Sequence, residues 1–191
     1  MGASDPALGV VVALPATMRR FAIALAHADR ELYADLDVRA AQHPSESDRY
    51  LVARVLARAL EHADGLEFSK GGVSDDTEPA LVQRDLRGDL VAWIEIGSPT
   101  PQRLHKAAKA SPRVVVYTWK SAAALRAALA DAKVHRAEQI EIIELSQDLL
   151  DAVTVTLDRV NRWDLSVTGG SLYLTIAGRL FEGTLDVLRS S

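Results

Sequence analysis

Two groups of carboxylates are the residues of this chain best placed to do chemistry. Glu95 lies near the end of an apolar run, Leu90 to Gly97, which reads Leu-Val-Ala-Trp-Ile-Glu-Ile-Gly. The second group is the acidic segment Asp75-Asp76-Thr77-Glu78-Pro79. A buried, ionised carboxylate requires a hydrogen-bonded partner, a cation or a raised pKa. Glu95 therefore either binds a ligand or is held in a structural ion pair, for which Lys106 and Arg84 are the candidate partners.

A strand hairpin is the element that would bring these acids together. Leu81 to Arg84 and Leu90 to Ile96 have the residue types of strands, and Arg87-Gly88-Asp89 between them has those of a turn. Both faces of the second strand are apolar, which is typical of a strand covered on both sides. Folded as a hairpin, the segment places the acidic cluster beside Glu95.

A helix and another buried strand follow. Thr100 and Pro101 suit the N-cap and first position of a short basic helix that contains Arg103 and Lys106. Val114 to Trp119 then reads as a strand. Because a helix separates it from Leu90 to Ile96, the two strands are expected to be adjacent and parallel.

The rest of the pattern predicts an α/β (α+β) fold, in which a mixed sheet has helices on its faces. Residues 1–17 are expected to be a loosely held extension, and residues 18–191 a single domain. The other expected strands are Phe21–Ala26 and Leu36–Ala40, paired as an antiparallel hairpin, then Leu66–Ser69, Ile140–Leu145, Trp163–Val167, Ser171–Ile176 and Leu180–Leu188. The other expected helices run from a cap at Ser45 to about Ala63, from Ser121 to about Lys133, and from Ser146 to about Arg162.

Composition excludes several kinds of site. The chain of 191 residues has no cysteine, so disulfides, thiolate metal sites and cysteine nucleophiles are excluded, and a reducing cytoplasm is the expected compartment. A net charge of −4 argues against a surface that coats nucleic acid broadly, but not against a local basic groove. No apolar run reaches the length of a membrane span. The five histidines lack paired metal-ligand spacing, which disfavours zinc.

Four short motifs, in this order, resemble those of the bacterial YaeQ family. They are His43-Pro44-Ser45-Glu46, Leu66-Glu67-Phe68-Ser69-Lys70-Gly71, Glu78-Pro79, and Trp93-Ile94-Glu95-Ile96-Gly97 followed by Pro99. The order helix, three strands, helix, strand also resembles the αβββαβ core of the PD-(D/E)XK nuclease superfamily, of which YaeQ proteins are described as a variant without an established activity. The resemblance implies that core, with an N-terminal hairpin and C-terminal strands added.

The nuclease resemblance implies metal-dependent phosphodiester hydrolysis. In that superfamily, acids bind one or two Mg²⁺ or Mn²⁺ ions that activate water. Carried over by position, Glu78 and Glu95 are the metal-binding acids, Asp76 is a further metal candidate, and Glu46 on the first helix is an additional carboxylate. DNA or RNA is the implied partner. The alternative is a non-catalytic nuclease-fold protein that binds nucleic acid or a protein.

One position departs from the nuclease pattern. Gly97 stands where the nucleases have their catalytic lysine, so that role does not carry over directly. Lys106, on the helix after Glu95, is the first replacement candidate, and Lys70 is the second. The sequence leaves open which of Asp75, Asp76 and Glu78 faces Glu95.

Overall fold

The computed structural model describes residues 15–69 and 78–188. Ten strands form one mixed sheet in the order β2-β1-β8-β9-β10-β7-β6-β5-β4-β3. The strands are β1 (Thr17–His27), β2 (Leu32–Gln42), β3 (Leu66–Phe68), β4 (Leu81–Arg84), β5 (Leu90–Ile96), β6 (Arg113–Thr118), β7 (Glu141–Leu145), β8 (Val160–Thr168), β9 (Ser171–Ile176) and β10 (Arg179–Leu188). The α-helices within these ranges are α1 (Asp48–Leu60), α2 (Pro101–Ala110), α3 (Ala122–Asp131) and α4 (Gln147–Thr154).

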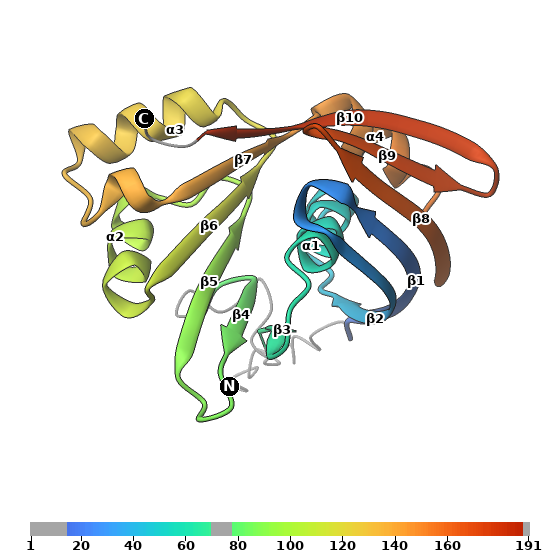
Figure 1. The fold of residues 1–191 in the computed structure, drawn as a ribbon, viewed down its shortest axis with the longest axis horizontal. Coiled ribbons are helices and arrows are strands. Elements are labelled where there is room, and N and C mark those ends of the chain that lie inside the picture. The colour runs from blue at the N-terminus through green and yellow to red at the C-terminus, as the bar shows by residue number, and fades with distance from the viewer. Residues whose placement is uncertain (1–14, 70–77, 189–191) are drawn as a thin grey trace, which may run out of the picture.

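Strand β10 joins the two parts of the sheet. Residues 179–184 pair antiparallel with β9, and residues 185–188 pair antiparallel with β7. Figure 1 shows the sheet bent at this junction, with α1 lying between the part that contains β4 to β7 and the part that contains β1, β2, β8 and β9.

The central strands β5 to β7 are covered on both faces. Alternate residues of a strand point to opposite sides of a sheet. On one side, Val115 and Tyr117 of β6 belong to the core that contains α1. On the other side, Val114 and Val116 pack in a second core with α2 and α3. Trp93 of β5 belongs to this second core, so Glu95, two residues later, also faces α2.

The predicted crossover is confirmed. Strands β5 and β6 are adjacent and parallel, with α2 between them in the chain, and β4 pairs antiparallel with β5. The N-terminal hairpin is also antiparallel, as expected, with Thr17 opposite Gln42. The part of the chain that the structure describes holds no helix long and apolar enough to cross a membrane.

Two helix predictions were wrong at their ends. Helix α1 begins at Asp48, because Ser47, not Ser45, accepts the Tyr50 amide at 3.2 Å. The helix predicted from Ser146 to about Arg162 ends at Thr154. The β-branched residues at 153–156 favour helix poorly, and the chain then enters β8, which pairs in parallel with β1.

Candidate functional site

Glu95 is held by two donors on the α2 side of the sheet. Its side chain is buried, and its Oε1 atom accepts hydrogen bonds from Trp93 Nε1 and from Arg103 Nε, both at 2.7 Å. Burial raises the pKa of Glu95 above its ordinary value, and the hydrogen bonds from Trp93 and Arg103 oppose part of that rise. The predicted ion pair exists, but the partner is neither Lys106 nor Arg84.

Arg103 is brought to Glu95 by the start of α2. Thr100 caps the helix by accepting the Arg103 amide at 3.2 Å, and this first turn places the guanidinium over the end of β5. The Arg103 Nη2 atom donates to the main-chain oxygen of Glu78 at 2.5 Å. The structure thus brings Glu78 and Glu95 to the same guanidinium, Glu78 through its backbone and Glu95 through its carboxylate.

This arrangement fits a guanidinium better than a divalent metal ion. Mg²⁺ is held by oxygen ligands, usually carboxylates with water or substrate. Here the Glu95 carboxylate already has a cation at 2.7 Å, and Glu78 gives a carbonyl to that same cation. Within residues 15–69 and 78–188, no three acidic or histidine side chains are grouped so as to hold a metal. Asp76, the further metal candidate, lies outside the described residues, as do Asp75 and Lys70.

Two positions bear on the catalytic lysine, the replacement candidate Lys106 and the glycine at position 97. Lys106 is exposed, three residues beyond Arg103 on α2, and so lies on the same side of the helix about one turn away. Gly97 has a φ of +91°, a conformation that side chains other than glycine rarely adopt. A Cβ there would lie 3.5 Å from the Trp119 ring, an ordinary contact, so the backbone angle rather than crowding favours glycine.

Two aromatic rings lie beside Gly97. Tyr50 and Trp119 are half-buried and meet edge to face, with ring centroids 6.5 Å apart. Burial is the main cause that raises the pKa of Tyr50 to about 12, and the charges of Arg54, Glu95, Glu46 and Arg103 also act on it. Tyr50 therefore keeps its proton at neutral pH and can donate a hydrogen bond.

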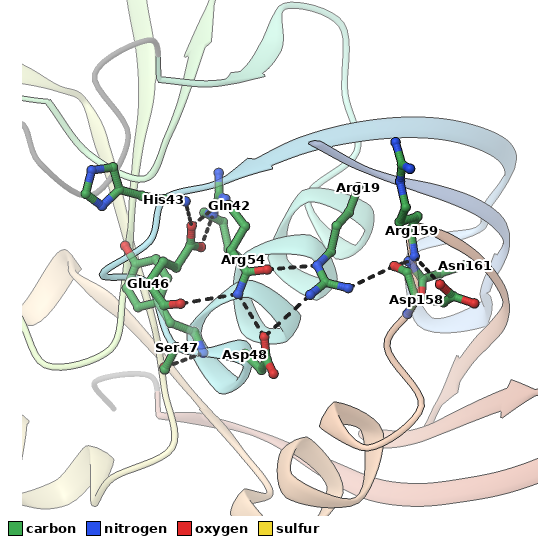
Figure 2. Close-up of polar contacts among 11 residues, drawn as sticks. Arg19, Gln42, His43, Glu46, Ser47, Asp48, Arg54, Asp158, Arg159 and Asn161 are labelled. Atoms are coloured by element: carbon green, nitrogen blue, oxygen red, sulfur yellow. Dashed lines mark hydrogen bonds and ion pairs between the residues drawn. The ribbon is translucent and has the colours of Figure 1, made fainter. Parts of the chain in front are cut away.

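Glu46 forms a second buried ion pair. Its Oε1 and Oε2 atoms accept from Arg54 Nε at 2.9 Å and Nη2 at 3.0 Å, and the His43 amide donates to Oε2 at 3.2 Å (Figure 2). The Arg54 guanidinium also lies 4.8 Å from the centre of the Phe68 ring. Glu46 lies in the turn before α1, not on the helix as predicted, and both of its carboxylate oxygens accept from Arg54.

Sequence reasoning missed the two arginines that hold these acids. Arg54 lies on α1 and is only 5% exposed, because α1 is enclosed by both parts of the sheet (Figure 1). For Arg54 the sequence held no signal of this burial, because Arg54, Arg58 and Glu61 share one side of the helix and have the pattern of a face turned to water. For Arg103, the signal was a basic residue in the first turn of a helix that starts directly after the strand carrying the acid.

The chain is similar along most of its length to proteins of one bacterial family. Residues 12–184 match the family profile described as "YaeQ protein". The "Uncharacterized protein YaeQ" of Escherichia coli K12 is 35% identical over 114 residues, which are 59% of this chain and 62% of the relative, so this alignment spans less than two thirds of the relative. The protein of the same name from Salmonella typhi is 27% identical over 176 residues, 90% of this chain and 94% of the relative.

Two solved structures have a similar fold. The YaeQ protein of Xanthomonas axonopodis pv. citri superposes with a TM-score of 0.83 at 32% identity, over 92% of this chain and 99% of that chain. The YaeQ protein of Pseudomonas syringae superposes with a TM-score of 0.83 at 27% identity, over 92% of this chain and 97% of that chain.

Proposed function

The chain belongs to the YaeQ family, and we propose that it is a nuclease-like protein that binds nucleic acid through α2 and the Glu95 site. The observation that carries this proposal is the Arg103–Glu95 pair. A buried carboxylate that accepts from a guanidinium fixes the orientation of that guanidinium. The Arg103 side chain remains 23% exposed, so a fixed cation faces solvent at the end of β5.

The surface of α2 supplies further positive charge. The helix contains Arg103, His105, Lys106 and Lys109, and none of its residues is acidic. Lys106 and Lys109 are exposed, and the spacing of three places each beside the preceding basic residue. Basic side chains on one helix face bind the phosphates of nucleic acid, even in a protein whose net charge is −4.

The rings of Tyr50 and Trp119 suit the binding of a single-stranded nucleic acid. Bases stack on aromatic side chains with little dependence on sequence. Both rings are half-buried, and Gly97 beside them has no side chain to cover them. We therefore expect the ligand to be single-stranded DNA or RNA, with phosphates at α2 and a base against Trp119.

Fluorescence anisotropy with a labelled single-stranded oligonucleotide tests this proposal. Binding should weaken steeply as salt rises, and Lys106→Gln should reduce both the affinity and the steepness. The matched control is Arg162→Gln, which removes one exposed positive charge from the opposite part of the sheet and should leave binding unchanged. Salt-insensitive binding, or an equal loss in both variants, would contradict the proposal.

Metal-dependent hydrolysis is the second candidate. It is favoured by one observation, that Glu78 and Glu95, the two acids that the nuclease resemblance assigns to the metal, lie on one guanidinium at the end of β5 and would be neighbours around an ion that displaced it. Incubation of the oligonucleotide with Mg²⁺ or Mn²⁺ tests it. Cleavage that requires the ion and is lost in Glu95→Gln would support hydrolysis, whereas binding without cleavage would leave the protein a binding module.

A further inference from the structure

A second site lies at the opposite end of α1 from Tyr50. A cavity of about 400 Å³ opens between the end of α1, the strands β6, β7 and β10, and the turn between β8 and β9. Its polar lining includes His27, Glu61, Arg113, Tyr117 and Glu141. This volume is in the range of cavities that bind small molecules. None of these residues belongs to the Glu95 site.

The interior of the cavity carries excess negative charge. Arg113 donates to Glu61 at 2.8 Å through Nη1 and to Glu141 at 2.7 Å through Nε, so one cation is shared by two carboxylates. Burial alone would lower the pKa of Arg113, but its bonds to Glu61 and Glu141 raise it, and the guanidinium stays charged. Tyr117 donates its hydroxyl to Glu61 at 2.8 Å and adds no charge.

The surroundings do not cancel that excess. Leu60 and Glu61 are at the C-terminal end of α1, where the helix dipole is negative. At the rim, Asp29 and Arg30 carry opposite charges. Asp29 accepts from the amides of Gly169 and Gly170, and Arg30 donates to the Leu60 carbonyl. A positively charged ligand is therefore the one that the cavity complements.

His27 supplies an unused acceptor. His27 is 8% exposed and lines the cavity, and its Nδ1 atom has no hydrogen-bond partner among the described residues. Burial, and then the charge of Arg30, lower the pKa of His27, so the ring is neutral at pH 7.5. An ammonium group only donates hydrogen bonds and matches both an imidazole nitrogen and carboxylates.

We propose that this cavity binds a small organic cation, a primary or secondary ammonium attached to an apolar body. The ammonium would lie between His27, Glu61 and Glu141. The apolar body would lie against Ile143, Val167, Leu185 and Val187, which form the remaining wall. The proposal does not depend on nucleic-acid binding or hydrolysis.

Three probes that share one ring test the charge preference: benzylamine, benzyl alcohol and benzoate. The readout is the His27 imidazole proton resonance at pH 7.5, identified by its loss in His27→Gln. Benzylamine should shift it saturably, with a dissociation constant on the order of a millimolar, and benzyl alcohol should bind more weakly. Benzoate binding as tightly as benzylamine, or no shift at about 50 mM benzylamine, would overturn the proposal.

Two variants test the location. Glu141→Gln leaves Arg113 paired with Glu61 but removes the excess charge, so benzylamine should bind about tenfold more weakly. Glu182→Gln removes an exposed carboxylate of β10 outside the cavity and should change nothing. Val187→Trp should fill the cavity beside β10 and abolish any shift of the His27 resonance by the three probes. Unchanged benzylamine binding in Glu141→Gln or in Val187→Trp, with a normal thermal melt, would also refute the site.

Discussion

The Arg103–Glu95 pair should be asymmetric, so that removing the arginine destabilises the protein more than removing the acid. The Glu95 side chain is 5% exposed and that of Arg103 is 23% exposed. In Arg103→Gln, a buried carboxylate loses its cation. Two unit charges about 4 Å apart interact by about 4 kcal/mol at an effective dielectric constant near 20. Because the carboxylate can take up a proton instead of staying charged, we expect a loss of about 2 to 4 kcal/mol at pH 7.5.

The reverse change should cost about 1 kcal/mol or less. In Glu95→Gln, the amide oxygen can still accept from Trp93 and from Arg103, and Arg103 keeps partial contact with water. The substitution also removes the burial penalty that raises the pKa of Glu95. Arg103→Lys should recover part of the loss of Arg103→Gln, since it restores the charge without the planar fork.

Urea denaturation of the parent and the three variants, at constant pH and salt, measures these differences in the free energy of unfolding. A greater loss in Glu95→Gln than in Arg103→Gln would refute the assignment of Arg103 as the partner that stabilises the acid. Repeating the thermal melts with Mn²⁺ adds an independent check. A rise in melting temperature that grows with Mn²⁺ in the parent but not in Glu95→Gln would show that a metal competes with Arg103 for this carboxylate.

Three further predictions concern stability. Arg54→Leu should lower the free energy of unfolding by about 3 to 5 kcal/mol, because it leaves Glu46 buried without its cation. Arg49→Leu breaks the more exposed pair with Asp151 and should lower it by about 1 kcal/mol or less. Urea denaturation compares the two variants. Gly97→Ala and Gly97→Lys should each lower the free energy of unfolding by about 1 to 3 kcal/mol, because the positive φ of residue 97 strains any other side chain. Gly97→Lys should not confer cleavage in the oligonucleotide assay. Unchanged stability in either variant would contradict the claim that the backbone angle requires glycine. The raised pKa of Glu95 means that the folded state binds the carboxyl proton more tightly than the unfolded state does. The contribution of protonated Glu95 to stability is therefore fully present below its ordinary pKa of 4.5 and is lost as the pH rises through the raised pKa. The unfolding free energy of the parent minus that of Glu95→Gln should therefore fall from pH 4.5 upward, and an increase would reverse the sign that burial predicts.

The sequence predicted most of what local pattern determines. The bounds of β4 and β5 agree with the expected ones residue for residue, and the crossover rule placed β5 and β6 side by side. The β-branched residues at 153–156 were a local signal for the end of α4, although the predicted helix ran past them.

The partners of the acids could not be predicted, because they depend on how elements pack. Arg84 donates to the Gly88 carbonyl in the turn after β4, while Lys106 lies about a turn beyond Arg103 and is exposed. Likewise, Glu61 is 5% exposed only because β6 brings Arg113 and Tyr117 to the end of α1. No periodicity within α1 indicates that its ends meet two charged clusters.

The parallel pairing of β1 with β8 has a consequence for how the chain folds. It sets Arg20 opposite Val160, 140 residues later in the sequence. The hairpin of β1 and β2 can form early from local contacts, but the other edge of β1 has no strand to pair with until β8 has been made. Long-range pairing of this kind slows folding, and an unpaired apolar strand edge is prone to aggregate. The N-terminal hairpin therefore needs protection in a growing chain, because it docks on β8 only after residues 160–168 have been made.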